Sequence, residues 1–283
     1  MSKFIISGFS DEIDARLSVQ MDELDKLDIH YIEVRGVDDK NIAQHSHEEV
    51  RAIKKRLKAR GFKISAVGSP IGKIKIADDF APHLTAFQHV LETAKILETP
   101  YIRMFSFFLP ASEAPAKYRD EVLRRWSGFI AAAKGSGIRL LHENEKGIYG
   151  DNAERCLDLV ESLGSDNLRL IFDPANFIQC GVESYPHAYQ MLKAHVVYLH
   201  IKDALRESGA VRPAGYGDGR VREILADLKA RGFEGFLSLE PHLGKFKGFA
   251  ELEPNSPANN LPDGGLKMFA IAAEALRKLL AEI

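Results

Sequence analysis

The segment 139–143 reads RLLHE, a strand-like run of apolar residues that ends in a carboxylate. The pattern returns as LRLIFD at 168–173, VVYLH at 196–200 and GFLSLE at 235–240, so the four runs end in Glu143, Asp173, His200 and Glu240. These residues are 30, 27 and 40 positions apart, and a strand with its helix takes about 30 residues. The spacing predicts four consecutive β-α units, each with a polar side chain where its strand ends.

Four more units precede these. Short apolar runs, which predict strands, alternate with longer segments of helical periodicity. The predicted strands are Phe4–Gly8, Tyr31–Val34, Lys63–Val67 and Tyr101–Phe108. The predicted helices are Ala15–Leu27, His47–Arg60, Pro82–Leu97 and Ala116–Lys134. The later helices are predicted at Asn152–Leu163, Tyr185–Ala194, Arg220–Arg231 and Gly265–Ala281. The chain thus contains eight β-α units, and its composition does not change along its length in a way that would indicate a second domain. This predicts one (β/α)8 TIM barrel domain over residues 1–283. A doubly wound sheet is the alternative, but it usually has fewer repeats and a glycine-rich first turn.

The bulk composition is that of a globular enzyme. An apolar fraction of 45% and a charged fraction of 28% are ordinary, and a formal charge of −2 gives no basic field, so no nucleic-acid partner is expected. No stretch approaches the roughly 18 apolar residues of a membrane span, and the first residues lack the long apolar core of a secretory signal. We therefore expect no membrane partner and a cytoplasmic location. Cys156 and Cys180 are expected to be reduced packing residues.

Strand alternation allows the four polar residues to converge. The residues two positions earlier share their face, and these are Leu141, Ile171, Tyr198 and Ser238. An inward ligand would thus have mainly apolar or small neighbours beneath it. A single acidic strand end is more often a helix cap or a surface ion pair, but four in consecutive units favour a metal site. Three carboxylates and one imidazole suit Mn²⁺ or Mg²⁺, with Co²⁺ as a further option.

The segments around these residues read HENEKG at 142–147, FDPAN at 172–176, LHIKD at 199–203 and LEPH at 239–242. They resemble the metal-site motifs of the sugar phosphate isomerase/epimerase superfamily, the xylose isomerase-like TIM barrels. The resemblance covers essentially the whole chain, including IEVR at 32–35 and GYG at 215–217. It implies that the metal ligands are Glu143, Asp173, His200 and Glu240, and that the two glutamates are also the catalytic acid/base pair of the 3-epimerases in that group.

Four further residues are predicted to contact the substrate: Lys202, Arg206, Asn176 and His242. Lys202 shares the inward face with His200, and His242 shares that of Glu240. Arg206 stands where 3-epimerases of this group place a substrate-contacting arginine. Asn176 stands where some of them carry histidine, a departure that weakens a specific ketose 3-epimerase assignment.

Two long segments follow strands that carry ligand candidates. Glu207–Gly219 is rich in glycine, and His242–Asp263 contains three prolines. Loops after the strands of a TIM barrel lie on its active-site face, so both are predicted to be lids that close over a bound polyol. The alternative is that they are insertions of no consequence.

The predicted function is a metal-dependent isomerase or epimerase of a small hydroxy-carbonyl sugar or sugar phosphate. A carboxylate on each side of the carbon could move the α-proton through an enediolate that the ion stabilises. Three alternatives stay open: an inosose-type dehydratase on the same site, a catalytically silent sugar-binding barrel, and an apurinic-site endonuclease, which needs more histidines. Lys73, Lys75 and Arg103 are too scattered to decide whether the substrate is phosphorylated. The predicted partner is a small sugar or polyol, and a homo-oligomer stays open.

Overall fold

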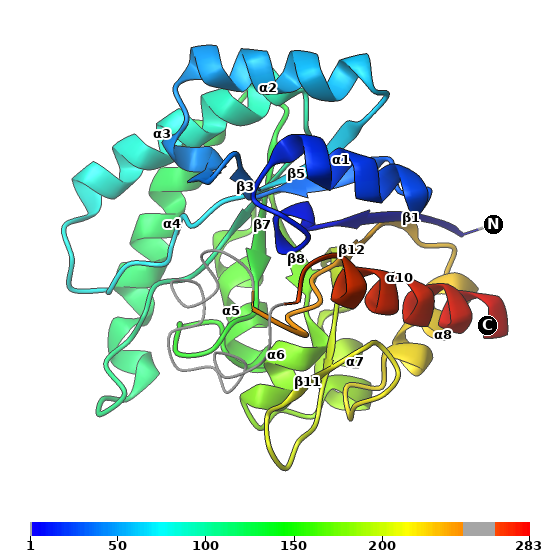
Figure 1. Cartoon of the computed structure of the whole chain (residues 1–283). Coiled ribbons are helices and arrows are strands. Elements are labelled where there is room, and N and C mark those ends of the chain that lie inside the picture. The colour runs from blue at the N-terminus through cyan, green and yellow to red at the C-terminus, as the bar shows by residue number, and fades with distance from the viewer. Residues whose placement is uncertain (1, 246–263) are drawn as a thin grey trace.

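Eight parallel strands form a nearly closed barrel at the centre of the molecule (Figure 1). The structure, a computed structural model, describes residues 2–245 and 264–283. The strands are β1 (Lys3–Gly8), β2 (Tyr31–Val34), β5 (Lys63–Gly68), β6 (Tyr101–Met104), β7 (Arg139–Glu143), β8 (Leu168–Phe172), β9 (Val196–Ile201) and β12 (Glu234–Leu239). They are hydrogen-bonded in the order β1-β12-β9-β8-β7-β6-β5-β2, and the two end strands contact each other. The predicted TIM barrel is confirmed.

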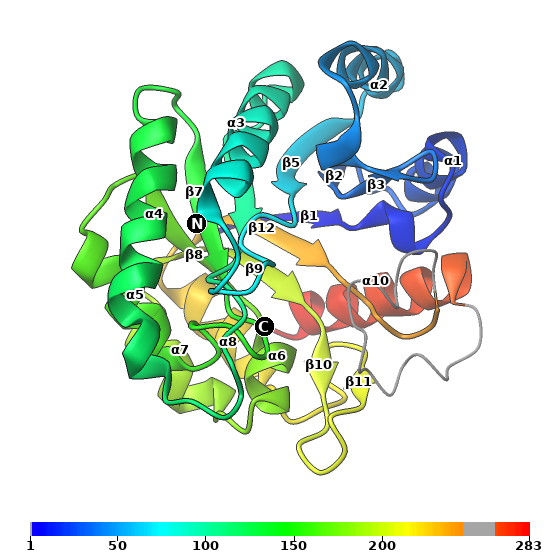
Figure 2. The same ribbon diagram turned by 90° about the vertical axis from the view of Figure 1, so that its left-hand side faces the viewer.

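Helices lie around the outside of the strands (Figure 2). They are α1 (Leu17–Lys26), α2 (His47–Ala59), α3 (Phe80–Leu97), α4 (Arg119–Ala133), α5 (Ala153–Leu163), α6 (Pro174–Gln179), α7 (Tyr189–Leu192), α8 (Val221–Ala230) and α10 (Gly265–Glu282). Helix α2 illustrates the local cause: Val50, Ile53 and Leu57 recur at helical spacing and are buried, while Ser46 and Glu49 form a capping box. None of the helices within the described ranges is long and apolar enough to cross a membrane.

The predicted strand at Tyr101–Phe108 is too long. Strand β6 ends at Met104, and the chain then turns toward the loop between β5 and α3. The backbone N–H groups of Phe105 and Phe107 donate to the carbonyl groups of Ile71 and Gly72, at 2.8 and 3.0 Å. The aromatic run is therefore held by a distant loop rather than by the barrel, which local sequence does not reveal.

The predicted helix Tyr185–Ala194 is interrupted. Tyr185 has extended φ and ψ angles of −138° and 134° inside the turn Ser184–Ala188, and the regular helix α7 begins only at Tyr189. The cause lies in the sequence, because a residue that precedes proline, here Pro186, is disfavoured in the helical conformation. Helix α6 was not predicted, although Asp173 at its N-cap and Pro174 at its first position are a known start signal.

The barrel interior beneath the ends of β7, β8 and β9 is small and closed. Leu141, Ile171, Tyr198 and Ala66 form one buried cluster there. The Tyr198 hydroxyl is 2.9 Å from Ser65 Oγ, which in turn is 2.6 Å from Ser7 Oγ, so the buried hydroxyl groups satisfy one another. This packed floor leaves the polar chemistry to the ends of the strands above it.

The segment Glu207–Gly219 is tied to the end of β9. Short strands β10 (Asp203–Ala204) and β11 (Val211–Arg212) pair antiparallel. The buried carboxylate of Asp203 accepts hydrogen bonds from the backbone N–H groups of Gly215, Gly217 and Gly219, at 3.1, 3.0 and 2.7 Å. Its closure over a ligand stays a prediction. The other predicted lid, His242–Asp263, lies outside the described residues from position 246 onward.

Candidate metal centre

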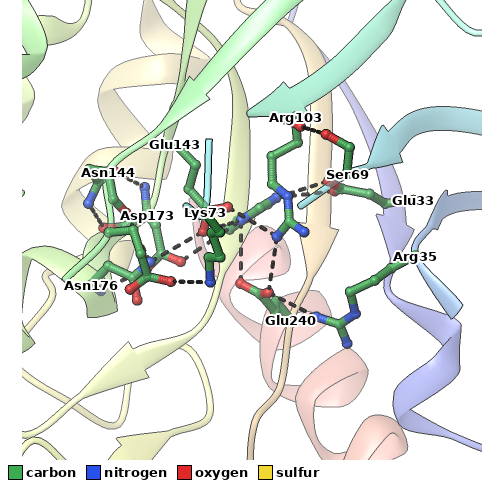
Figure 3. Close-up of polar contacts among 12 residues, drawn as sticks. Glu33, Arg35, Ser69, Lys73, Arg103, Glu143, Asn144, Asp173, Asn176 and Glu240 are labelled. Carbon is green, nitrogen blue, oxygen red and sulfur yellow. Dashed lines mark hydrogen bonds and ion pairs between the residues drawn. The ribbon is translucent and has the colours of Figure 1, made fainter. Parts of the chain in front are cut away.

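The four predicted ligands meet at the carboxyl ends of four strands, and Figure 3 shows three of them, Glu143, Asp173 and Glu240. Glu143 ends β7, Asp173 follows β8, His200 lies near the end of β9, and Glu240 follows β12. One ligand atom from each lies within 4.8 Å of those of all the others, and all four side chains are buried. Asp173 also caps α6, because its Oδ1 accepts a hydrogen bond from Asn176 N–H at 2.9 Å, which leaves Oδ2 to the cluster.

The His200 ring is placed with its two nitrogens in different surroundings. Nδ1 lies 3.0 Å from Glu143 Oε1, 3.4 Å from Glu240 Oε2 and 3.9 Å from Asp173 Oδ2. Nε2 lies 3.2 Å from Glu33 Oε2, an oxygen that also accepts a hydrogen bond from the Tyr198 hydroxyl at 2.8 Å. A tautomer that donates from Nε2 to Glu33 would leave Nδ1 as the ligand atom.

Lys202 contributes a cation to the same cluster. Its Nζ lies 2.7 Å from Glu240 Oε2 and 3.0 Å from Asp173 Oδ2. Burial alone would lower the pKa of Lys202, but the neighbouring carboxylates, Asp173 first, hold this pKa well above its usual value. Lys202 therefore stays charged beside two carboxylate oxygens that could also ligate a metal ion.

Two buried arginines complete the site, and neither was predicted from the sequence. Arg103 Nη1 lies 3.2 Å from Glu143 Oε2 and 3.8 Å from Glu240 Oε1. Arg35 Nη1 lies 3.3 Å from Glu240 Oε1, and its Nε donates to Asp11 Oδ2 at 2.8 Å. The sequence contained a signal for both, because Arg103 and Arg35 lie at the ends of β6 and β2, just as the predicted ligands lie at the ends of their strands.

The electrostatics of the cluster favour one divalent ion. Burial raises the pKa of the Asp173 carboxyl; at Glu240 burial acts in the same direction, but Lys202, His242 and His200 outweigh it and hold the pKa well below its usual value. The cations Arg103 and Lys202 lie in a cluster with four buried carboxylates. These belong to Glu33, Glu143, Asp173 and Glu240. When Arg35 is balanced by Asp11 and the imidazole is neutral, as it is when it ligates a metal, the group carries a formal charge of −2, which a single divalent cation would neutralise.

Two buried atoms test whether an ion fits here. Asp173 Oδ2 and His200 Nδ1 form no hydrogen bond of regular geometry within the described residues, although Lys202 Nζ and Glu143 Oε1 each lie 3.0 Å from one of them. Such groups are costly to bury unless something else satisfies them. An oxygen-rich donor set with one imidazole nitrogen suits a hard or borderline divalent cation. The residues therefore fit a metal ion.

The predicted substrate contacts divide into two groups. Lys202, Asn176 and His242 lie in or beside the cluster: Asn176 Nδ2 donates to Glu143 Oε1 at 3.2 Å, and His242 Nε2 lies 3.6 Å from Glu240 Oε1. Arg206 is exposed at the start of the turn between β10 and β11. The backbone N–H of Arg206 donates to Asp218 Oδ2 at 2.8 Å. Its contact with substrate stays a prediction.

The chain belongs to the xylose isomerase-like TIM barrel family, whose family model matches residues 21–267. A curated relative, 2-epi-5-epi-valiolone 7-phosphate 2-epimerase from Actinoplanes sp. (strain SE50/110), is 26% identical over 167 residues. The match covers 59% of this chain and 59% of that relative, so this chain spans less than two thirds of the relative's length.

Solved structures share the fold across nearly the whole chain. A D-tagatose 3-epimerase-like protein has a TM-score of 0.75 at 17% identity, with 99% of this chain and 97% of that chain covered. An IOLI protein with a bound zinc atom has a TM-score of 0.72 at 16% identity, with 98% of both chains covered. A Mycobacterium smegmatis barrel in complex with magnesium has a TM-score of 0.69 at 16% identity, with 98% and 96% covered.

Proposed function

We propose that this protein is a metal-dependent epimerase or isomerase of a small hydroxy-carbonyl sugar or polyol. The observation that carries the proposal is the convergence of Glu143, Asp173, His200 and Glu240 in one buried cluster at the mouth of the barrel. The oxygen-rich donor set favours Mn²⁺ or Mg²⁺, with Co²⁺ as a further option. The zinc and magnesium of two structural neighbours support a divalent ion without deciding which one.

The protein's own residues would move the proton. One of the two carboxylates, Glu143 or Glu240, takes the proton from the carbon beside the carbonyl group. The C–H electron pair then forms a carbon–carbon double bond, and the carbonyl π electrons move to oxygen, which gives an enediolate. The other side chain, which has to enter this step as the carboxylic acid, gives its proton to the carbon, and the electrons on oxygen return to form the carbonyl group. A bound divalent ion would supply Lewis-acid stabilisation of the charge on oxygen.

A dehydratase is the second candidate. The same enediolate can expel a hydroxyl group from the next carbon, provided that a nearby acid protonates the leaving oxygen. The carboxyl group that has taken the α-proton can give it to the leaving oxygen, and Lys202 can hydrogen-bond that oxygen, because its ammonium group lies 2.7 Å from Glu240 Oε2 inside the cluster. An apurinic-site endonuclease is less well supported, because His200 and His242 are the histidines that the described residues place at the cluster.

The test combines metal binding with proton exchange. Anomalous scattering after Mn²⁺ soaking should give a peak about 2.0–2.6 Å from the four ligands. Proton NMR in D₂O should then show exchange of the substrate α-hydrogen for a member of a panel of ketoses and inososes. Glu143→Gln and Glu240→Gln should each lower the exchange rate by roughly 10²–10⁴-fold, because glutamine keeps the shape but loses the basicity.

Glu154→Gln is the matched control, because Glu154 lies outside the site on α5 and pairs with the exposed His187 at 2.9 Å. Its exchange rate should equal that of the unmodified protein. A protein that binds metal and sugar but exchanges no panel member would instead support a binding barrel. Undiminished exchange in Glu240→Gln would remove that residue from the mechanism.

A further inference from the structure

Arg103 is a buried cation with an unused donor. Its side chain is 4% exposed and reaches from β6 toward Glu240, between Glu143 and Glu33 (Figure 3). The guanidinium carbon lies 5.1 Å from the ring centre of Phe9 and 4.8 Å from that of Phe105, so aromatic rings pack against it. Its Nε–H is buried and has no hydrogen-bond acceptor among the described residues. A buried donor without an acceptor is unfavourable in a folded protein.

Arg35 shows what a structural arginine of this site looks like. Its Nε and Nη2 groups donate to Asp11 Oδ2 and Oδ1 at 2.8 and 3.1 Å, and Nη2 also reaches Glu12 Oε1 at 3.3 Å. These two donors are occupied by Asp11 and Glu12, which are not among the proposed ligands, although Nη1 of Arg35 also lies 3.3 Å from Glu240 Oε1. Arg103 differs, because its Nη1 contacts the two proposed acid/base residues and its Nε remains available.

We propose that Arg103 is a catalytic residue that donates a hydrogen bond to the oxygen of the substrate on which negative charge develops. The inference rests on the proposed function and deepens it. When Glu143 or Glu240 takes the α-proton, the carbonyl π electrons move to oxygen, and the Arg103 N–H group stabilises that oxyanion without giving up its proton. A charged donor held in place before the reaction is worth more to the anion than to the neutral carbonyl group.

The position of Arg103 also decides which ligands the site prefers. Its Nη1 lies 3.2 Å from Glu143 Oε2 and 3.8 Å from Glu240 Oε1, so a substrate oxygen that reaches the guanidinium group would lie beside the two proposed proton-transfer carboxylates. Planar, ionised oxygen groups that resemble an enediolate should therefore bind better than neutral diols. Acetohydroxamate is such a group, and glycerol is a neutral comparison.

The experiment measures binding of acetohydroxamate and of glycerol to Mn²⁺-loaded protein by water-proton relaxation. The informative variant is Arg103→Lys, which keeps a cation beside Glu143 and Glu240 but loses the Nε donor and the planar fork. Acetohydroxamate affinity should fall roughly 10- to 100-fold in this variant, while Mn²⁺ affinity and glycerol affinity change clearly less, because lysine keeps the cation beside the two glutamates. Arg103→Met should show the same or a larger loss of acetohydroxamate binding.

Arg125→Lys is the matched control. Arg125 is equally buried but lies on α4, where its Nη2 donates to the carbonyl groups of Ile76 and Asp78 at 2.7 and 2.9 Å. It should bind acetohydroxamate as the unmodified protein does. Equal acetohydroxamate affinity in Arg103→Lys, or an equal loss for acetohydroxamate and glycerol, would overturn the role of Arg103 alone. An unmodified protein that binds no Mn²⁺ would overturn the proposed function and this inference together.

Discussion

At the scale of single residues, Glu33 controls how His200 is presented. Glu33 is fully buried and holds His200 Nε2 at 3.2 Å, and it also accepts a hydrogen bond from Tyr198. Burial alone would raise the pKa of Glu33, but the adjacent His200 first, and then Arg103, keep this pKa below its usual value. A carboxylate behind a ligating imidazole fixes the ring and makes it a better ligand.

Glu33→Gln should therefore weaken Mn²⁺ binding by roughly 10- to 100-fold. Glutamine keeps an oxygen that can accept from His200, but it removes the charge that supports the imidazole. Electron paramagnetic resonance of free Mn²⁺ gives the affinity directly. Glu145→Gln is the control, because its oxygens are held by Lys73 and Lys146 at 3.1 and 3.0 Å rather than by His200, so its loss should be clearly smaller. Equal losses in the two variants would contradict the specific role of Glu33.

The sequence predicted part of this site for a definite reason. A strand end is a local feature, and alternation places a ligand such as Asp173 on the inward face. Which charge pairs with which is not local: Arg103 joins β6 to residues 40 positions away at Glu143, and Arg35 reaches Glu240 across 205 positions. Arg103 alone in the sequence is one basic residue among many, and its burial becomes visible only when the barrel closes.

At the scale of elements, the loop between β5 and α3 depends on a neutral histidine. Gly72 N–H donates to His83 Nε2 at 2.8 Å, so this nitrogen must carry no proton. Gly72 has a φ of +93°, and a Cβ there would lie 2.1 Å from the Phe105 carbonyl oxygen, which fixes glycine at this crossing. Burial lowers the pKa of His83 to about 4, and the nearby Arg125 acts in the same direction.

This arrangement predicts a pH dependence of stability with a definite sign. The unfolded chain binds a proton at His83 near the ordinary histidine pKa of 6.5, while the folded chain does so only near a pKa of about 4. The free energy of unfolding should therefore fall as pH drops from about 6.5 toward about 4. Thermal midpoints at pH 7 and pH 5 should differ more for the unmodified protein than for His83→Gln, whose side chain cannot take up that proton. The same difference in both proteins would show that His83 does not contribute.

The elements themselves were mostly predictable, because each strand and helix carries its own pattern. Strand β2 and helix α2 begin where the apolar period begins, and α2 stops beside Gly61, whose φ is +78°. The prediction failed where a distant segment or a short signal decides the outcome. The conformation of Phe105–Phe108 is set by hydrogen bonds to the loop that carries Gly72. Helix α6 is too short to show a helical period in the sequence.

At the scale of the whole molecule, the proposed ion would join four consecutive strands of the barrel. Strands β7, β8, β9 and β12 each bring one ligand, and they are neighbours in the sheet. Lys202 and Arg103 form ion pairs with these carboxylates and offset part of their mutual repulsion. A bound ion would therefore couple metal binding to the stability of this half of the barrel.

An ion that binds the folded chain and not the unfolded one should raise the thermal midpoint. Mn²⁺ at a hundredfold excess over its dissociation constant stabilises the fold by about 2.7 kcal/mol, which for a chain of this size corresponds to roughly 5–10 °C. Differential scanning calorimetry with Mn²⁺ and after addition of EDTA measures the shift and its reversal. Asp173→Asn is the matched variant, because asparagine can still cap α6 through its side-chain oxygen while the cluster loses a charged ligand. Its midpoint should respond weakly to the same Mn²⁺ concentration. A shift of equal size in Asp173→Asn would place the stabilising ion elsewhere on the molecule, since the loss of a ligand must weaken any ion held between β7, β8, β9 and β12.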